Sequence, residues 1–355
     1  MINRIHGGNT NILKENRIVD FSASINPLGL PGRVSRIISR NMHNLTRYPQ
    51  PESNGLKEAI AEFHNTNPEN ILIGNGSIEL IHLIPRALKV RRCLIITPSF
   101  SEYEFAARLS GARTVFAQAY EKDGFNLLLS KFEKLIPGVD MVFLCNPNNP
   151  TGALTSRCDI SALFEICNRH KVILVLDEVF MDFVNNAHAF SMASRAPGES
   201  RLIVINSLTK FFALAGLRVG YLISSREITK KIAQFQYPWN VNVLAQEVSR
   251  EIITDKEYIR KSKALISRER AYLFGNLRSI KGLKVFTPGS NFILCKLEGA
   301  PIKSAKKLQE RLLKFRLLIR DCSNFRGLSE RFFRVAVRTR RENNELILGM
   351  GQALR

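Results

Sequence analysis

The chain lacks the features of several protein classes. Its six cysteines are scattered over 355 residues, and no two of them form a Cys-x-x-Cys pair, which argues against a zinc site and against a disulfide framework. No apolar run approaches the roughly 18 residues that span a bilayer, and the N-terminus has no charged-then-apolar secretory signature. We therefore expect a cytoplasmic protein with no membrane partner, in which most cysteines are small buried apolar residues.

Acidic residues are few relative to basic ones. The 52 Lys and Arg against 31 Asp and Glu give a net charge of +21, which would fit nucleic-acid binding. The densest basic region, residues 303–341, interleaves Lys and Arg with apolar residues, as solvated helix and strand faces do. Because no separate DNA-binding segment is recognisable, we expect no nucleic-acid partner, and a basic surface that attracts phosphorylated small molecules.

Short apolar runs alternate with longer amphipathic stretches in the first two thirds of the chain. Helical periodicity predicts helices at residues 55–64 and 77–88. A short strand or turn is predicted at residues 70–74, and strands are predicted at residues 93–97, 113–117, 141–145, 172–176, 202–205 and 219–223. This alternation predicts an α/β fold with a mostly parallel sheet covered by helices, in which ligands lie at the carboxyl ends of strands.

The pattern changes near residue 255. A long charged helix is expected at residues 256–276, and the elements expected after it are strands near 283–286 and 292–296, a helix at 304–314 and a strand at 332–338. We interpret residues 255–355 as a smaller α+β domain, 41–254 as a large cofactor-binding domain, and 1–40 as an N-terminal arm that contributes to the small domain and the substrate site. No Gly/Ser linker separates them, so they should pack closely along a cleft.

Three polar residues each follow a predicted strand. Asn149 lies in an Asn-Pro-Thr-Gly turn, Asp177 follows an apolar run, and Lys210 ends a Ser-Leu-Thr-Lys segment. A lysine amine can hold an aldehyde cofactor as a Schiff base, and a carboxylate can keep a pyridine nitrogen protonated so that the ring accepts electrons. Their order and spacing predict a pyridoxal 5'-phosphate site, with Lys210 and Asp177 catalytic and Asn149 donating to the ring hydroxyl.

Further residues could hold this cofactor. The turn at Gly76 and Ser77 precedes a predicted helix, and a helix N-terminus directs N–H groups and a positive dipole end at an anion. Arg218 could pair with the cofactor phosphate, and Phe100 could stack on the ring. Structural alternatives stay open, since a glycine turn is often only an N-cap and a loop aromatic often only packs.

Longer motifs resemble one enzyme family. They lie at residues 6–9 (His-Gly-Gly-Asn), 20–29, 237–242 and 319–325 (Ile-Arg-Asp-Cys-Ser-Asn-Phe), and so cover both ends and the middle of the chain. The chain resembles pyridoxal phosphate enzymes of the type I fold, in the branch that contains histidinol-phosphate aminotransferases and the threonine-phosphate decarboxylases of cobalamin synthesis. The finer features are similar to the decarboxylases.

The resemblance implies roles for many residues. Around the cofactor phosphate it places Gly76, Ser77, Ser207 and Arg218. For the phosphate and carboxylate of the substrate it implies His6, Gly7, Asn26, Asn149, Arg320 and Arg334. It also implies a homodimer in which Tyr48 reaches the partner's cofactor phosphate. A frayed terminus is the structural alternative for His6, and surface charge is the alternative for the two arginines.

The implied reaction is decarboxylation of O-phospho-L-threonine to 1-aminopropan-2-yl phosphate for the cobalamin nucleotide loop. Many aminotransferases of this fold carry a tyrosine three residues after the pyridinium aspartate, where this chain has Phe180. The resemblance associates a phenylalanine there with the decarboxylase branch. Histidinol-phosphate aminotransferase remains the alternative, since it shares the fold, the cofactor and a phosphorylated substrate.

Overall fold

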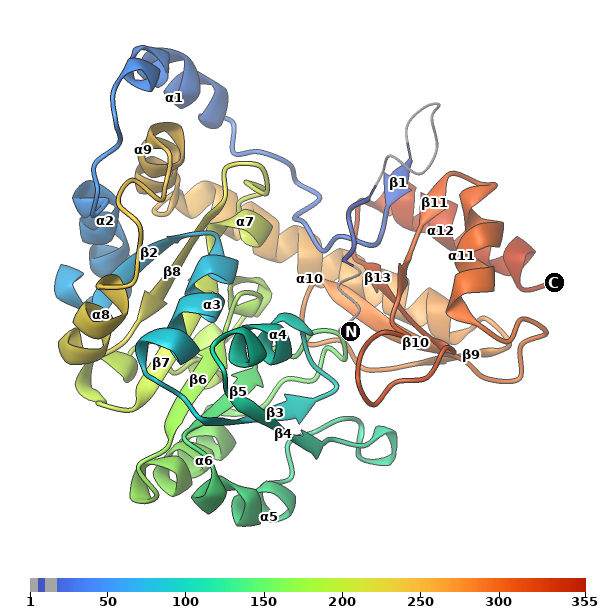
Figure 1. Cartoon of the computed structure of the whole chain (residues 1–355). Coiled ribbons are helices and arrows are strands. Elements are labelled where there is room, and N and C mark those ends of the chain that lie inside the picture. Colours follow the sequence, from blue (N-terminus) through green and yellow to red (C-terminus); the bar gives the residue numbers. More distant parts are fainter. Residues whose placement is uncertain (1–5, 10–17) are drawn as a thin grey trace.

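The computed structural model describes residues 6–9 and 18–355. A seven-stranded sheet forms the left half of the molecule in Figure 1, with strand order β2-β8-β7-β6-β5-β3-β4. Its strands are β2 (Ile71–Asn75), β3 (Arg92–Thr97), β4 (Arg113–Gln118), β5 (Met141–Cys145), β6 (Ile173–Asp177), β7 (Leu202–Ser207) and β8 (Val219–Ile223). Strand β8 pairs antiparallel with β2 and β7, whereas the other pairs are parallel, which confirms the predicted mostly parallel sheet.

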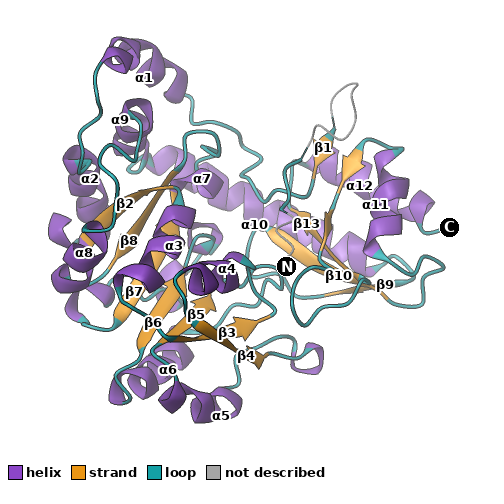
Figure 2. Ribbon diagram, in the orientation of Figure 1, coloured by secondary structure: helices purple, strands orange, loops and turns teal. Residues whose placement is uncertain are grey.

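The helices of this half surround the sheet or, like the first of them, pack on another helix (Figure 2). They are α1 (Val34–Asn41), α2 (Asn54–His64), α3 (Ser77–Ala87), α4 (Glu102–Leu109), α5 (Leu129–Phe132), α6 (Arg157–Arg169), α7 (Leu208–Phe211), α8 (Arg226–Ala233) and α9 (Val243–Ile252). Helix α3 packs on β2 and β8, and α6 packs on β6. The central strand β5 is buried along its whole length, as expected for an apolar strand with both faces covered.

The parallel strands β3, β5, β6 and β7 end at one edge of the sheet. Asp177 is the last residue of β6, and Lys210 lies in the short helix that follows β7. Asn149 lies in the turn after β5, and Phe100 follows β3. The edge therefore collects the side chains that strand order and chain direction predict to meet there.

A second sheet occupies the right half of Figure 1. It is antiparallel with order β12-β13-β10-β9, formed by β9 (Leu283–Val285), β10 (Phe292–Leu297), β12 (Arg320–Asp321) and β13 (Phe332–Ala336). Helix α10 (Lys256–Arg278) runs from the large sheet to this one, and α11 (Ala305–Leu313) and α12 (Arg340–Ala353) pack beside it. Helix α12 begins with a Thr339–Glu342 capping box and was not predicted.

The segment before α1 is attached to the second sheet region. Strand β1 (Val19–Asp20) pairs in parallel with β11 (Leu317–Leu318), and the Phe21 carbonyl accepts a hydrogen bond from the Ala336 N–H. This pairing joins segments from opposite ends of the chain. The domain bounds at residues 40 and 254 stay a prediction.

Five of the six cysteines are buried, which confirms the prediction that most of them are, and Cys158 is exposed. In residues 6–9 and 18–355 no helix is both long and apolar enough to cross a membrane. Within the same residues no three His, Cys, Asp or Glu side chains gather where they could hold a metal ion.

Candidate active site

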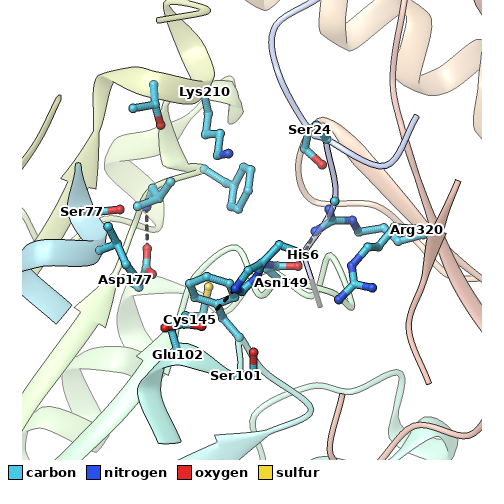
Figure 3. A pocket seen from close by; sticks show the side chains of 18 of the residues that line it. His6, Ser24, Ser77, Ser101, Glu102, Cys145, Asn149, Asp177, Lys210 and Arg320 are labelled. Carbon is cyan, nitrogen blue, oxygen red and sulfur yellow. Dashed lines mark hydrogen bonds and ion pairs between the residues drawn. The ribbon is translucent and has the colours of Figure 1, made fainter. Parts of the chain in front are cut away.

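A cavity of about 400 Å³ lies between the strand ends of the large sheet and the second sheet. Figure 3 shows Lys210 directed into it, with Ser77 and Asp177 on one side and Ser24 and Arg320 on the other. Most residues predicted for the site line this cavity: His6, Gly7, Ser77, Phe100, Asn149, Asp177, Lys210, Arg218, Arg320 and Arg334. The fold thus brings residues from both halves of the chain together.

Lys210 is placed by the turn that ends β7. The Ser207 hydroxyl caps α7 by accepting a hydrogen bond from the Thr209 N–H at 3.2 Å. Burial, reinforced by the positive charges of Arg334 and Arg218, lowers the pKa of Lys210 to about 8. A sizeable fraction of this amine is therefore neutral near physiological pH, and the neutral amine is the form that attacks an aldehyde.

Asp177 is a buried carboxylate with two donors. The Tyr103 hydroxyl donates to Asp177 Oδ2 at 2.6 Å, and the Val179 N–H donates to Oδ1 at 3.0 Å. Burial raises the pKa of Asp177, while these hydrogen bonds and the Lys210 charge oppose the rise. Tyr103 is itself fixed by stacking on Phe143, with ring centroids 4.9 Å apart. A carboxylate held this way suits a protonated ring nitrogen.

The N-terminus of α3 forms an anion cradle. Its N-cap Gly76 has φ of 73°, a backbone conformation that favours glycine, and a Cβ there would displace the Arg218 guanidinium. Ser77 and Arg218 line the cavity, where helix N–H groups and a guanidinium can share a phosphate. Gly76 and Ser207 lie behind this lining; the Ser207 hydroxyl is hydrogen-bonded to Thr209 Oγ1 at 2.8 Å, and Thr209 lines the cavity.

Arg320 and Arg334 form the opposite wall. They pair directly across β12 and β13, and each is 6% exposed. Arg334 donates to Asn149 Oδ1 and to the Ser22 carbonyl, while Arg320 donates to the Asp321 carbonyl and to Asn324 Oδ1. Burial lowers the pKa of both, that of Arg334 to about 10. Because like charges directly opposite in a sheet are unfavourable, this wall is suited to an anionic ligand.

The structure does not place Asn26 in the cavity lining, so its substrate contact stays a prediction. Its side chain lies outside the cavity and donates to the Phe211 carbonyl and to Ser262 Oγ, both at 2.7 Å, while its oxygen accepts from the Leu28 N–H. Two residues earlier, Ser24 lines the cavity, is 2% exposed, and has no hydrogen-bond partner for its hydroxyl among the described residues. A loop serine carries no sequence signal of its own.

Other cavity residues were also missed. Glu102 and Tyr103 line the cavity from α4, where Tyr103 follows Phe100 by three residues, a spacing that could have suggested a shared face. Phe180 also lines it, with its ring 4.9 Å from Phe292.

Comparison with known proteins identifies the family. Residues 16–349 match the model of aminotransferase class I and II, so the chain belongs to that family, whose members are pyridoxal phosphate-dependent enzymes. It is 40% identical to a putative threonine-phosphate decarboxylase of Caldanaerobacter subterraneus over 96% of this chain and 92% of that protein. It is 35% identical to the threonine-phosphate decarboxylase of Salmonella typhimurium over 100% of this chain and 98% of that protein.

Solved structures agree on the fold. The histidinol-phosphate aminotransferase from Clostridium acetobutylicum superimposes with a TM-score of 0.87 at 33% identity, covering 94% of this chain and 98% of that one. The Sinorhizobium meliloti histidinol-phosphate aminotransferase, solved in complex with pyridoxal-5'-phosphate, has a TM-score of 0.83 at 20% identity over 94% of this chain and 90% of that one. The chain therefore has the type I fold predicted for it.

Proposed function

We propose that this enzyme decarboxylates O-phospho-L-threonine with pyridoxal phosphate as cofactor. The observation that carries the proposal is the wall formed by Arg320 and Arg334, two buried guanidiniums directly opposite each other. A substrate with both a phosphate and a carboxylate supplies an anion for each. The identity with threonine-phosphate decarboxylases over nearly the whole chain supports this choice.

The residues present fit the cofactor. Lys210 would hold its aldehyde, Asp177 its ring nitrogen, Phe100 its ring face, and Ser77 with Arg218 its phosphate; Asn149 would donate to the ring hydroxyl. When bound, pyridoxal phosphate supplies an electron-accepting ring next to the reacting carbon. The burial that lowers the pKa of Lys210 to about 8 suits an amine that must react as a nucleophile and later carry a proton.

The chain's own groups then act on the substrate. Arg334, held by Asn149 and Ser22, binds the carboxylate, while Arg320 and His6 bind the phosphate. The bond between Cα and the carboxylate breaks, carbon dioxide leaves, and the electron pair left at Cα takes up a proton that Lys210 delivers. The product keeps the amine and the phosphate.

We further propose that the enzyme works as a homodimer. Tyr48 is 80% exposed, stacks on Trp239 with ring centroids 4.6 Å apart, and lies outside the cavity of its own chain. Exposed Met42 and Leu45 lie close to it in sequence, as expected for a surface that a second copy covers. Sedimentation analysis that finds only a monomer at micromolar concentration would remove this role for Tyr48.

Histidinol-phosphate aminotransferase is the second candidate, supported by the match to the Clostridium acetobutylicum enzyme. The deciding experiment incubates cofactor-loaded protein with O-phospho-L-threonine alone and measures carbon dioxide. Release without a 2-oxo acid supports the decarboxylase. No release, with amino transfer from histidinol phosphate once a 2-oxo acid is added, would replace it by the aminotransferase.

A further inference from the structure

A buried carboxylate lies beside the cavity and takes no part in the steps described above. Glu102 is the first residue of α4 and is 1% exposed. Its Oε1 lies 3.1 Å from His6 Nε2, and its Oε2 lies 3.1 Å from His82 Nε2. Burying a carboxylate is costly unless it is paired, and here two imidazoles and the N-terminus of a helix of eight residues surround it.

Glu102 connects three separate segments. His82 belongs to α3, Glu102 to α4, and His6 to the N-terminal segment, 96 residues away from Glu102 in sequence. His82 anchors one carboxylate oxygen from a neighbouring helix. The other oxygen is thereby oriented toward His6, whose side chain is 43% exposed and lines the cavity.

The N-terminal segment is also held from the opposite wall. The Gly8 N–H donates to Ser22 Oγ at 2.8 Å, and Ser22 Oγ donates to Asp20 Oδ1 at 2.6 Å. A Cβ at Gly7 would lie 2.3 Å from the Ser22 carbonyl oxygen, so glycine permits this close approach. Residues 6–8 thus lie across the cavity, fixed at one end by Glu102 and at the other by the loop that follows β1.

This geometry constrains the His6 ring. A hydrogen bond between Nε2 and Glu102 occupies one ring nitrogen and leaves Nδ1 for a ligand. A carboxylate that holds one nitrogen of an imidazole sets the direction of the other, as it does for histidines that bind metals. His6 also lies against Phe100, with ring centroids 5.7 Å apart, which restricts the ring further.

We infer that Glu102 is a positioning residue that holds His6 in the orientation that binds the substrate's phosphate group. The inference rests on the proposed function for the identity of that substrate. Glu102 would thus contribute to the preference for a phosphorylated amino acid. It acts by orienting His6 and does not contact the reacting atoms.

The test is a double-mutant cycle on the cofactor-loaded enzyme. Glu102→Gln keeps the size of the side chain and removes its charge; it should raise KM for O-phospho-L-threonine about tenfold, while kcat changes by less than about twofold. In a His6→Ala background the same substitution should change KM by less than about twofold, because Glu102 then has no His6 ring to orient. Glu104→Gln is the matched control, since Glu104 lies on the same helix, pairs with Arg326 and Arg108, and does not line the cavity.

An equal rise in KM with and without His6 would overturn the inference, as would an unchanged KM in Glu102→Gln. If Glu102→Gln does not fold, Glu102→Asp, which keeps the charge and shortens the reach, is read in the same way.

A second measurement does not depend on turnover. With ¹³C-labelled histidine, the six histidines of the cofactor-loaded protein give resolvable ring signals, and His6 is identified by its loss in His6→Ala. Inorganic phosphate should shift the His6 signal saturably, and Glu102→Gln should weaken that binding about tenfold. A His6 shift without carbon dioxide release would reject the proposed function and keep the role of Glu102. Carbon dioxide release with no His6 shift would reject the role of Glu102 and keep the proposed function.

Discussion

The two walls of the cavity are built in different ways. On the large-sheet wall, Asp177 ends β6 and Lys210 follows β7 within three residues, so the local sequence places each group. On the facing wall, Arg334 donates to Ser22, which is 312 residues away in sequence. The chemistry assigned to the cofactor is therefore encoded locally, whereas substrate recognition depends on pairing the two ends of the chain.

The walls also differ in how their charges are balanced. Asp177 has the Tyr103 and Val179 donors and the nearby Lys210 charge, so that wall is nearly compensated within the protein. Arg320 and Arg334 are directly opposite like charges, and the Arg334 Nε has no hydrogen-bond partner among the described residues. Two buried guanidiniums side by side suit a doubly anionic substrate, whose negative groups would lie against both.

The largest effect on turnover is expected for Lys210, on the wall formed at the strand ends of the large sheet. Lys210→Ala should lower turnover of O-phospho-L-threonine by at least about a thousandfold, since no other lysine of residues 6–9 and 18–355 lines the cavity to act as nucleophile and proton carrier. The visible absorbance of the covalently held cofactor should disappear in the same variant. Lys307→Ala, which removes an exposed lysine of α11, serves as the control. Retained absorbance and turnover in Lys210→Ala would refute the site.

The same division explains what could be predicted from the sequence. Strands such as β5 and the positions of Asp177 and Lys210 follow from apolar runs and the polar residue after each run, and the structure confirms the strands. The β1–β11 pairing was not predicted, because two-residue strands carry no periodicity. Ser24 lines the cavity and was not predicted, whereas Asn26 was predicted and does not line it, since tertiary contacts decide which way a loop residue faces.

Arg334→Ala should have the next largest effect. Removing one partner of a buried charged contact costs about 2–5 kcal/mol, so kcat/KM should fall by about 30-fold or more. Arg334→Lys should recover only part of the loss, because an ammonium cannot replace the two-pronged contact with a carboxylate. The exposed Arg341→Ala is the control for net charge. A comparable loss in that control would mean that charge in general, and not this wall, determines activity.

Tyr103→Phe should shift the pH dependence of kcat/KM through its effect on Asp177. The phenol hydrogen bond stabilises the ionised form of Asp177 and lowers its pKa, so removing it raises that pKa further. The acid limb of the kcat/KM profile should then move to higher pH, and activity on the acid side should fall by about tenfold. Tyr120→Phe, which alters a phenol that is 48% exposed, should leave the profile unchanged. An acid limb that moves to lower pH would contradict the assigned role.

Ser24→Ala should have the smallest effect. It separates an effect on substrate binding from an effect on protein stability at the wall of Arg320 and Arg334. The Ser24 hydroxyl has no partner among the described residues, so its loss should leave the Tm within about 2 °C. If it donates to the substrate, KM should rise about two- to tenfold, the value of one net hydrogen bond. Ser249 is a matched control, since its buried hydroxyl is also unpartnered but lies in α9, outside the cavity. A rise in KM for Ser24→Ala but not for Ser249→Ala would show that the Ser24 hydroxyl binds the ligand. The same KM in both variants would show that Ser24 is only a packing residue.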